Sequence, residues 1–391
     1  MHILFIIHSI TLYGANRSVI DLALQLQKLG KDVFFFIPLE GKQKERYVLK
    51  KILDDAGISY IFLDYNPSVH SIQEKVFFSR IIRMKKNQKC LQIMEEYVKL
   101  WGIDIIHTNT FTHTIGVLLS KRVKKPHVWH IRETLKKDYA LAYDSKLLYR
   151  YALVKTSQVI CISEYVRRTY KKVLWGTPVT VLHNGFNINN YILTGVFQKN
   201  PPVFTLMISG TIREEKGQLD AVKAVELLIH KYQVKNIRLI IIGDGVKEYG
   251  DQIKRFIKQK KLEDYIEILP FQTELRKIRK HADIALMCSR NEALGRVTIE
   301  SMLSENIVIG TNSAGTAEII TDGVNGYLYE VGNVEDLSSK IFDVITHWSE
   351  QEKIVKKAKE YAKQNYNIEE YTKKIIDIYS RLIEENDRKE L

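Results

Sequence analysis

Uninterrupted apolar runs alternate with amphipathic stretches through the first half of the chain. Residues 2–8, HILFIIH, form one such run, which is typical of a parallel strand buried on both faces. A polar turn follows. Apolar residues then recur every three or four positions over 19–29 and Gly30 comes next, which predicts a helix that ends there. Similar runs predict further strands at residues 32–39, 59–63, 104–109, 127–132, 158–163 and 179–184.

The alternation restarts after residues 190–204, a stretch with a glycine and two adjacent prolines that we interpret as a linker. A strand is predicted at 204–210 and a helix at 218–232. Further apolar runs predict strands at residues 237–245 (with its closing turn), 266–271, 282–289 and 306–311, and an amphipathic helix at 368–386.

Two successive runs of strand–helix units predict an α/β protein with two doubly wound, Rossmann-like domains. We expect one domain over residues 1–195, a second over 196–367, and a last helix at about 368–391 that packs back on the first. The length agrees with this, because single cores stop growing near ~250–300 residues and the chain has 391. Ligands of such sheets bind beyond the carboxyl ends of the strands, so we expect a cleft between facing domains.

Composition places the chain among ordinary globular proteins, with 45% hydrophobic and 27% charged residues. No window approaches ~18 uninterrupted apolar residues, so no transmembrane helix is expected. The N-terminal apolar run is short and lacks a basic region before it, unlike a signal peptide. Three widely spaced cysteines suit a reducing compartment and suggest no disulfide framework or zinc site. We therefore expect a cytoplasmic protein.

The two halves of the chain differ in net charge. Residues 1–195 hold 29 Lys and Arg against 15 Asp and Glu, a net of +14, whereas residues 196–391 have a net of −1. The excess indicates a partner surface in the first half. Residues 74–89 combine six basic residues with two phenylalanines and two isoleucines. Such a segment is either an interfacial helix on anionic lipid or a solvated helix packed on its own domain.

The stretch NEALGRVTIESM, residues 291–302, carries the clearest candidate chemistry. It follows a predicted strand, and we expect a helix from about Arg296 to Ser304 with Gly295 at its entry. The first N–H groups of a helix have no intrahelical acceptor and favour anions. The N–H groups of Gly295, Arg296 and Val297 would therefore form a site for a phosphate.

Two glutamates bracket this helix start. Glu292 lies on the loop before it, and Glu300 lies about one turn inside. Carboxylates accept paired hydrogen bonds from vicinal hydroxyls, so the two acids suit the sugar and ribose ends of a nucleotide sugar. Spacing alone favours the plainer interpretation, in which Glu292 is a loop acid and Glu300 a helix-face acid with no ligand.

A basic turn, SGTIREEKGQ at residues 209–218, holds Arg213 and Lys216 just after a predicted strand. A lysine there could pair with a phosphate as a point charge, or it could lie in solvent. Residues 313–329, SAGTAEIITDGVNGYLY, supply another turn of small residues, followed by a predicted helix that holds Glu318.

In this order the segments resemble the family 4 retaining glycosyltransferases of GT-B fold, particularly bacterial members of polysaccharide assembly. The likeness spans nearly the whole chain and is most specific over residues 204–332. It is carried by YGANRS, VICISEYVRRTY, VLHNGFN, SGTIREEKGQLDAVKAVELL, LIIIGDG, ADIALMCSRNEALGRVTIESM and SAGTAEIITDGVNGYLY.

The resemblance implies roles for the candidate residues. Glu292 would position the donor hexose, Glu300 would hold the ribose, and Lys216 would neutralise the diphosphate. Backbone amides at Gly295 and Arg296 would approach that diphosphate. It implies a nucleotide-sugar-binding C-terminal domain, an acceptor-side N-terminal domain, a UDP- or GDP-sugar as co-substrate, and neither metal nor other cofactor.

In the N-terminal domain the resemblance implies that Gly14 lets the first loop close over the phosphates. The family's H-x-H pattern becomes HTN here, so Asn109 stands at the usual active position. The segment WHIRE supplies His130 at the end of the next strand, either lining the cleft or hydrogen-bonded at a strand end.

A second departure concerns the phosphate-binding arginine of the family. It usually follows the strand glycine directly, where this chain has Thr211. Arg213, two residues further on, is the candidate replacement.

The leading hypothesis is a retaining hexosyltransferase that moves a sugar from a nucleotide donor to an acceptor hydroxyl. A lipid-linked or polysaccharide acceptor, with peripheral contact to anionic membrane, would explain the basic first half. The alternatives are a GT-B sugar-nucleotide epimerase or phosphorylase, a non-catalytic scaffold, and a nucleic-acid-binding protein suggested by the pI of about 9.3. No recognition-helix or RNA-binding signature supports the last, so we expect no nucleic-acid partner.

Overall fold

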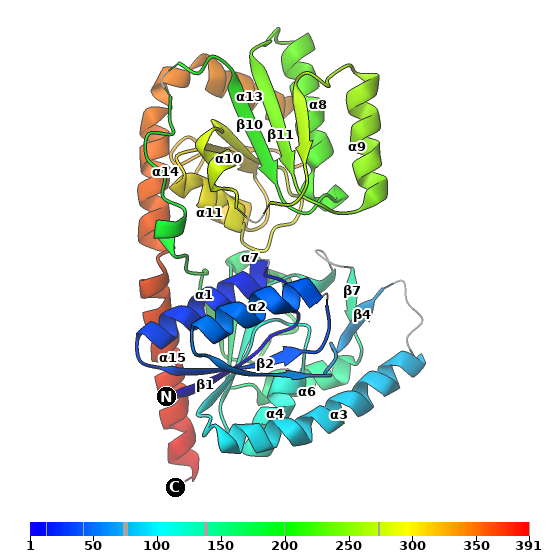
Figure 1. Cartoon of the computed structure of the whole chain (residues 1–391), viewed down its shortest axis with the longest axis vertical. Coiled ribbons are helices and arrows are strands. Elements are labelled where there is room, and N and C mark those ends of the chain that lie inside the picture. The colour runs from blue at the N-terminus through cyan, green and yellow to red at the C-terminus, as the bar shows by residue number, and fades with distance from the viewer. Residues whose placement is uncertain are drawn as a thin grey trace. The chain divides into compact units, whose positions relative to one another are not determined.

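The computed structural model describes the chain apart from residues 13, 42, 73–76, 137–139, 199, 273 and 391, and apart from the side chains of 77, 78 and 390 (Figure 1). It divides into two compact units. The first comprises Met1–Phe186 together with Ile368–Leu391, and the second comprises Asn187–Asn367.

A seven-stranded parallel sheet forms the centre of the first unit, in the order β3-β2-β1-β5-β6-β8-β9. Most of its strands are the uninterrupted apolar runs of the sequence. A separate antiparallel pair, β4 and β7, was not predicted from the sequence because each strand has only three residues. The strands are β1 (His2–Ile6), β2 (Asp32–Pro38), β3 (Ser59–Leu63), β4 (Val69–Ser71), β5 (Ile105–Thr108), β6 (His127–Ile131), β7 (Leu141–Tyr143), β8 (Gln158–Cys161) and β9 (Val179–Val181).

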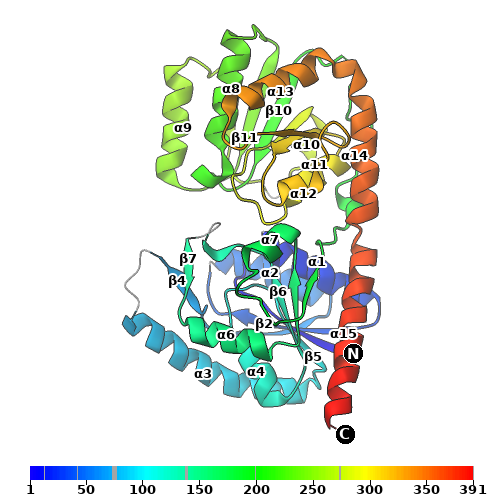
Figure 2. The same ribbon diagram turned by 180° about the vertical axis from the view of Figure 1, so that it is seen from behind.

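Helices cover both faces of this sheet (Figures 1 and 2). Alternate residues of β1 point to opposite sides: Phe5 packs in the cluster that includes α1 and α15, and Leu4 packs in the one that includes α3 and α4. The helices are α1 (Gly14–Lys28), α2 (Gln43–Asp55), α3 (Phe77–Leu100), α4 (Ile115–Val123), α6 (Lys146–Lys155), α7 (Glu164–Thr169) and α15 (Ile368–Glu390).

The last helix returns to the first unit through a close backbone contact. The Ile368 N–H donates to the Phe186 carbonyl over 3.0 Å. A methyl group on Gly185 would lie 2.8 Å from the Ile368 Cα and 2.7 Å from the Tyr371 Cβ, so only glycine fits there. In this way α15 completes the core on the α1 face of the sheet.

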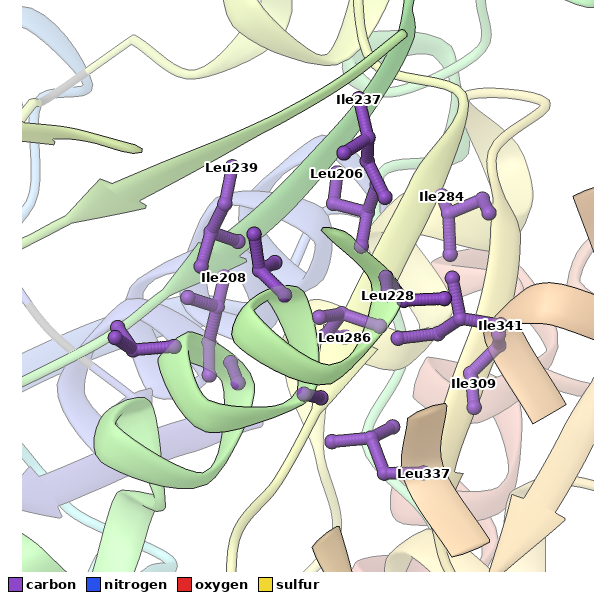
Figure 3. Close-up of a cluster of buried hydrophobic side chains, with 14 of the residues drawn as sticks. Leu206, Ile208, Leu228, Ile237, Leu239, Ile284, Leu286, Ile309, Leu337 and Ile341 are labelled. Carbon is purple, nitrogen blue, oxygen red and sulfur yellow. The ribbon is translucent and has the colours of Figure 1, made fainter. Parts of the chain in front are cut away.

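The second unit has a six-stranded parallel sheet in the order β12-β11-β10-β13-β14-β15. Figure 3 shows its core, in which aliphatic side chains from neighbouring strands meet those of α8 and α13. The strands are β10 (Phe204–Ser209), β11 (Ile237–Ile242), β12 (Ile266–Leu269), β13 (Ile284–Met287), β14 (Ile307–Thr311) and β15 (Tyr327–Tyr329). The helices are α8 (Gln218–His230), α9 (Lys247–Gln259), α10 (Arg276–Lys280), α11 (Arg296–Leu303), α12 (Thr316–Ile319), α13 (Val334–Thr346) and α14 (Glu352–Asn365), with short 3-10 turns η1 (Ile188–Asn190), η2 (Glu214–Lys216) and η3 (Trp348–Glu350).

Residues 187–195 belong to the second unit, whereas the sequence placed the boundary after residue 195. Hydrogen bonds account for this. The Ser304 hydroxyl donates to the Tyr191 carbonyl over 3.0 Å, and the Lys359 ammonium donates to the Leu193 carbonyl over 2.7 Å. The predicted linker is thus packed over its first residues against α11 and α14.

Within the described residues, no helix is long and apolar enough to cross a membrane, and no group of three or more His, Cys, Asp or Glu side chains is arranged to hold a metal ion.

Candidate functional site

The strand order of the second unit marks a place for a ligand. Strand β10 lies between β11 and β13, so the connections after β10 and β13 leave the sheet in different directions. Crevices outside the carboxyl ends of strands at such a reversal are where doubly wound sheets bind ligands. Lys216 follows β10 and Glu292 follows β13, so both candidate residues lie at this point.

Gly217 brings the turn after β10 against the end of β13. Its backbone is left-handed, with φ of 68°, and a side chain there would collide with the Cys288 carbonyl oxygen. Only glycine permits both features. The 3-10 turn η2 thereby places Lys216 beside the segment after β13.

Lys216 and Glu292 form an ion pair in this structure. The Lys216 Nζ lies 2.5 Å from the Glu292 Oε2, and the two side chains are 21% and 25% exposed. Both groups therefore remain accessible to a ligand. The Gly315 N–H donates to the Glu292 carbonyl over 2.7 Å, and this hydrogen bond holds the Glu292 loop in place.

The predicted helix after Glu292 is present as α11, Arg296–Leu303. Gly295 caps it in a left-handed conformation, with φ of 97° and ψ of 63°, which suits glycine. The first intrahelical acceptor is the Gly295 carbonyl, which receives the Thr298 N–H over 3.1 Å. The main-chain N–H groups of Gly295, Arg296 and Val297 thus precede the helical hydrogen-bond ladder at an end suited to anions.

Glu300, one turn inside α11, is held by two arginines. Its Oε2 accepts a hydrogen bond from Arg279 of α10, and its Oε1 lies 3.6 Å from the Arg296 Nε. Arg279 is buried. Tyr191 lies beside both arginines: the Arg296 Nη2 donates to its hydroxyl over 3.3 Å, and its ring centroid is 6.0 Å from the Arg279 guanidinium carbon.

The sequence did not single out Arg279, Tyr191 or Gly315. Arg279 is one of several basic residues in the segment RKIRK, and such a segment is typical of a solvent-exposed helix. For Gly315 the sequence gave one indication, because the small residues of the segment SAGTAE predict a tight turn. Contacts from distant segments make these residues part of the site.

Arg213 and Thr211 lie in the connection from β10 to η2. The Arg213 Nε is 3.9 Å from the Glu215 Oε2, and the Thr211 carbonyl accepts the Gln218 side-chain amide over 3.0 Å. Thr211 therefore contributes its backbone to the start of α8. Of the two, Arg213 is the one that carries a cationic side chain at this strand end.

The first unit has an equivalent reversal at β1, which lies between β2 and β5. Gly14 opens α1 after β1 with φ of 37°, a conformation that favours glycine. Asn109 follows β5 and is buried. Its side-chain amide donates to the Ala15 carbonyl over 3.1 Å, which ties the end of β5 to the first turn of α1.

His130 lies inside β6 and is fully buried. Its ring centroid is 5.3 Å from that of His107, whose Nδ1 lies 2.5 Å from the Tyr379 hydroxyl of α15. Neither ring nitrogen of His130 has a hydrogen-bond partner among the described residues, so the strand-end hydrogen bond considered from the sequence is absent. Burial, followed by the charge of Arg132, holds the pKa of His130 well below its usual range, and the ring is neutral.

Solved structures contain the same two kinds of unit. A glycosyltransferase from Rickettsia africae ESF-5 aligns with a TM-score of 0.79 at 20% identity, covering 98% of each chain. Anabaena HepE, determined with UDP-glucose, aligns with a TM-score of 0.76 at 22% identity, covering 97% of this chain and 100% of that one. Two parallel α/β sheets of this kind define the GT-B class of fold.

Family models match both halves of the chain. The model described as Glycosyltransferase Family 4 matches residues 13–190, and the one described as Glycosyl transferases group 1 matches residues 195–361. An uncharacterized glycosyltransferase of Methanocaldococcus jannaschii is 25% identical over 327 residues, which is 81% of this chain and 88% of that protein. The N-acetyl-alpha-D-glucosaminyl L-malate synthase of Bacillus anthracis is 22% identical over 73% of this chain and 77% of its own.

The chain belongs to the family 4 glycosyltransferases, which are retaining enzymes of GT-B fold. It is thus an enzyme that transfers a sugar from a nucleotide sugar.

Proposed function

We propose that the second unit binds the donor through the residues around α11. Glu292 positions the hexose, Glu300 accepts hydrogen bonds from the ribose hydroxyls, and Lys216 neutralises the diphosphate. The main-chain N–H groups of Gly295, Arg296 and Val297 donate hydrogen bonds to the phosphate oxygens. The observation that carries this proposal is the Lys216–Glu292 pair beside the N-terminus of α11.

Charge balance supports an anionic ligand. Lys216, Arg279 and Arg296 contribute three positive charges, whereas Glu292 and Glu300 contribute two negative ones. The set therefore keeps one excess positive charge beside a helix N-terminus, and both features favour a diphosphate. In the absence of donor, Glu292 holds Lys216 in place. When the diphosphate binds, it takes over hydrogen bonds of the ammonium group.

The chemistry follows from where charge develops. Breaking the bond between the sugar and the diphosphate leaves negative charge on the departing oxygen. Lys216, Arg213 and the N–H groups of α11 stabilise that charge, and no metal is required. Glu292 orients the sugar and forms no covalent bond to it, and the anomeric configuration is retained.

We assign the first unit to the acceptor. Asn109 stands at the family's usual active position, and its carboxamide oxygen accepts a hydrogen bond from the Arg132 Nε over 2.7 Å. His130 lies on the same face of the sheet and completes the candidate set.

Names of relatives suggest the donor and the acceptor. Structures of Anabaena HepE hold UDP, UDP-glucose, or UDP with glucose, so a UDP-sugar is the first donor to test and a GDP-sugar the second. One relative of this chain is the lipopolysaccharide core biosynthesis glycosyltransferase LpsE from Rhizobium meliloti, which is 22% identical over 58% of this chain. We therefore propose an acceptor hydroxyl in a surface polysaccharide or glycolipid.

A thermal-shift screen over UDP- and GDP-sugars tests the donor proposal. One nucleotide sugar should raise the melting temperature of the wild-type protein, and Glu300→Ala should abolish that rise. Glu335→Ala is the matched control, since Glu335 is an exposed acid of the same unit paired with Lys231. Unchanged calorimetric affinity of Glu300→Ala for every nucleotide sugar would contradict the proposal. Product analysis with the stabilising donor then separates transfer from epimerisation.

The basic first unit also supports contact with the cytoplasmic face of an anionic membrane. On α3, Ile81, Ile82 and Met84 are exposed among basic residues. On α6, Leu147, Tyr151 and Val154 are exposed at positions that share one helix face, and Leu147 is 84% exposed. Apolar side chains beside Lys and Arg fit the interface of an anionic bilayer. The two phenylalanines of the 74–89 segment have side chains outside the described part of the structure.

Vesicle flotation tests this contact. The protein should float with liposomes that contain anionic lipid and stay behind with neutral ones, and added salt should reduce recovery. Equal recovery on both kinds of liposome would contradict the membrane proposal.

A further inference from the structure

Strands β5 and β6 become polar toward their carboxyl ends on the α1 and α15 face of the sheet. His107 lies in β5 and His130 in β6, whereas Asn109 and Arg132 follow the ends of these two strands. The two histidine rings contact each other, and the Arg132 Nε donates to the Asn109 Oδ1, so the four residues form two contacting pairs across neighbouring strand ends. All four side chains are buried, and Arg132 is 5% exposed.

The guanidinium group of Arg132 binds two neutral side chains. Its Nε donates to the Asn109 Oδ1 over 2.7 Å, and its Nη1 donates to the Asn184 Oδ1. Its Nη2 has no acceptor at full hydrogen-bond geometry, but the Tyr371 hydroxyl of α15 lies within its reach: burial raises the Tyr371 pKa, and the charge of Arg132 and a side-chain hydrogen bond with it oppose that rise. Asn109 and Asn184 are uncharged, and among the described residues no carboxylate forms an ion pair with this arginine.

The neighbouring acid, Glu133, does not fill this role. Its carboxylate accepts the Phe111 N–H over 2.6 Å and the main-chain N–H of Arg132 over 3.2 Å. The Phe111 ring contacts Tyr143 and Tyr149, so the carboxylate bonded to the Phe111 N–H lies near these aromatic side chains. Burial is the main cause that raises the pKa of both tyrosines, and the negative charge of Glu133 adds to the rise.

A buried arginine without a counter-charge is costly, because its desolvation is not balanced by an opposite charge. The cost is greater here since both ring nitrogens of His130 and the Nε2 of His107 also lack partners among the described residues. Buried polar atoms in proteins are nearly always satisfied. Three unpartnered histidine nitrogens beside a buried guanidinium group with no counter-charge therefore indicate that something else completes this set.

We propose that Arg132 is the anchor of an anion-binding site in the first unit, which takes a phosphate or carboxylate group of the acceptor. An anion supplies the missing charge to Arg132 and accepts an N–H from a neutral histidine ring. The inference rests on the proposed function, because it names the chemistry of the acceptor that this unit receives. An uncharged glycan would leave Arg132 unpaired, so the acceptor carries its anionic group near the reacting hydroxyl.

Inorganic phosphate and acetate serve as probes in calorimetry and thermal unfolding of the full chain. Wild-type protein should bind at least one of them, and which one binds identifies the anionic group. Arg132→Gln should weaken that binding about ten- to a hundredfold, the range for hydrogen bonds to a charged group. Arg132→Lys should retain part of it. Arg122→Gln is the matched control, because it removes an arginine of the same unit that already pairs with Glu95.

The opposite result would show that Arg132 only stabilises the fold and does not bind an anion. In that case Arg132→Gln would lower the melting temperature of the ligand-free protein and leave the response to both anions unchanged. Absence of any wild-type response to either anion would also overturn the site. The proposed function and the anion site are tested by different variants. Glu300→Ala should lose nucleotide-sugar binding and keep the anion response, whereas Arg132→Gln should keep nucleotide-sugar binding and lose the anion response.

A second measurement applies if Arg132→Gln does not fold. Histidine ring resonances of wild-type protein can be followed by NMR during a titration with phosphate or acetate. The signals of His107 and His130 should shift, while those of exposed histidines such as His281 should respond only weakly. Unchanged His107 and His130 signals at saturating anion would overturn the proposal.

Discussion

Gly315 shows how a missing side chain can shape a donor site. A methyl group on this residue would lie 2.6 Å from the Leu294 Cα and 2.8 Å from the Ala293 carbonyl oxygen. Both contacts are with backbone, which cannot rotate away. The same glycine donates its N–H to the Glu292 carbonyl. The position of Glu292 therefore depends on a residue more than twenty positions away in sequence.

Gly315→Ala should displace the 292–294 loop and weaken donor binding. Overpacking of this kind costs roughly 1–3 kcal/mol, which corresponds to a melting temperature lower by several degrees for a unit of this size. Calorimetry with the stabilising nucleotide sugar measures the loss of affinity. Gly250→Ala is the control, because Gly250 lies in α9 with open space around it and should keep wild-type affinity. Wild-type affinity in Gly315→Ala would show that the loop tolerates the methyl group.

Helix α15 illustrates what an element contributes beyond its own sequence. It lies at the C-terminal end of the chain but packs in the core formed by the first residues. Its aliphatic residues Ile368, Ile375 and Leu382 are almost fully buried. Each is worth ~1.5–3 kcal/mol, so together they approach the entire stability of a typical domain, ~5–15 kcal/mol.

Removal of residues 368–391 should therefore unfold the first unit and leave the second one folded. Limited proteolysis followed by mass spectrometry measures this: cuts should appear within residues 1–186, and a fragment of about 187–367 should persist. Removal of 387–391 alone should change little, since residues 387–389 are exposed. Protection of the first unit in the longer truncation would show that its sheet is stable without α15.

At the scale of the whole molecule, four buried histidines lie in the first unit. Burial is the main cause that lowers the pKa of His113 and His127 to about 3 and holds the pKa of His107 and His130 well below 6.5. The unfolded chain binds protons that these rings do not bind when folded. The free energy of unfolding of the first unit is therefore unaffected by these histidines above about pH 6.5. It decreases as the pH falls toward 3, by up to about 1.4 kcal/mol per histidine and pH unit.

Acidification should consequently destabilise the first unit before the second. Thermal unfolding can be followed by tryptophan fluorescence in variants that keep either Trp129 or Trp348, one in each unit. Between pH 7 and 5 the midpoint reported by Trp129 should fall more steeply than that reported by Trp348. Equal slopes would contradict the assignment of the acid sensitivity to these histidines.

Local sequence was sufficient for several features of this protein. Uninterrupted apolar runs located the strands of both parallel sheets except the three-residue β15, because burial on both faces leaves no polar positions. The segment NEALGRVTIESM predicted α11 and its glycine entry, because cap preferences act within a few residues. The order of motifs identified the family.

The tertiary structure decided the rest. Arg279 of α10 and Tyr191 lie far from Glu300 in sequence, and only the packing of α10 and η1 against α11 brings them together. The same is true of Arg132, whose unpaired charge cannot be recognised from WHIRE. Periodicity and capping are local properties, whereas ion pairing and desolvation depend on which distant side chains share a buried space.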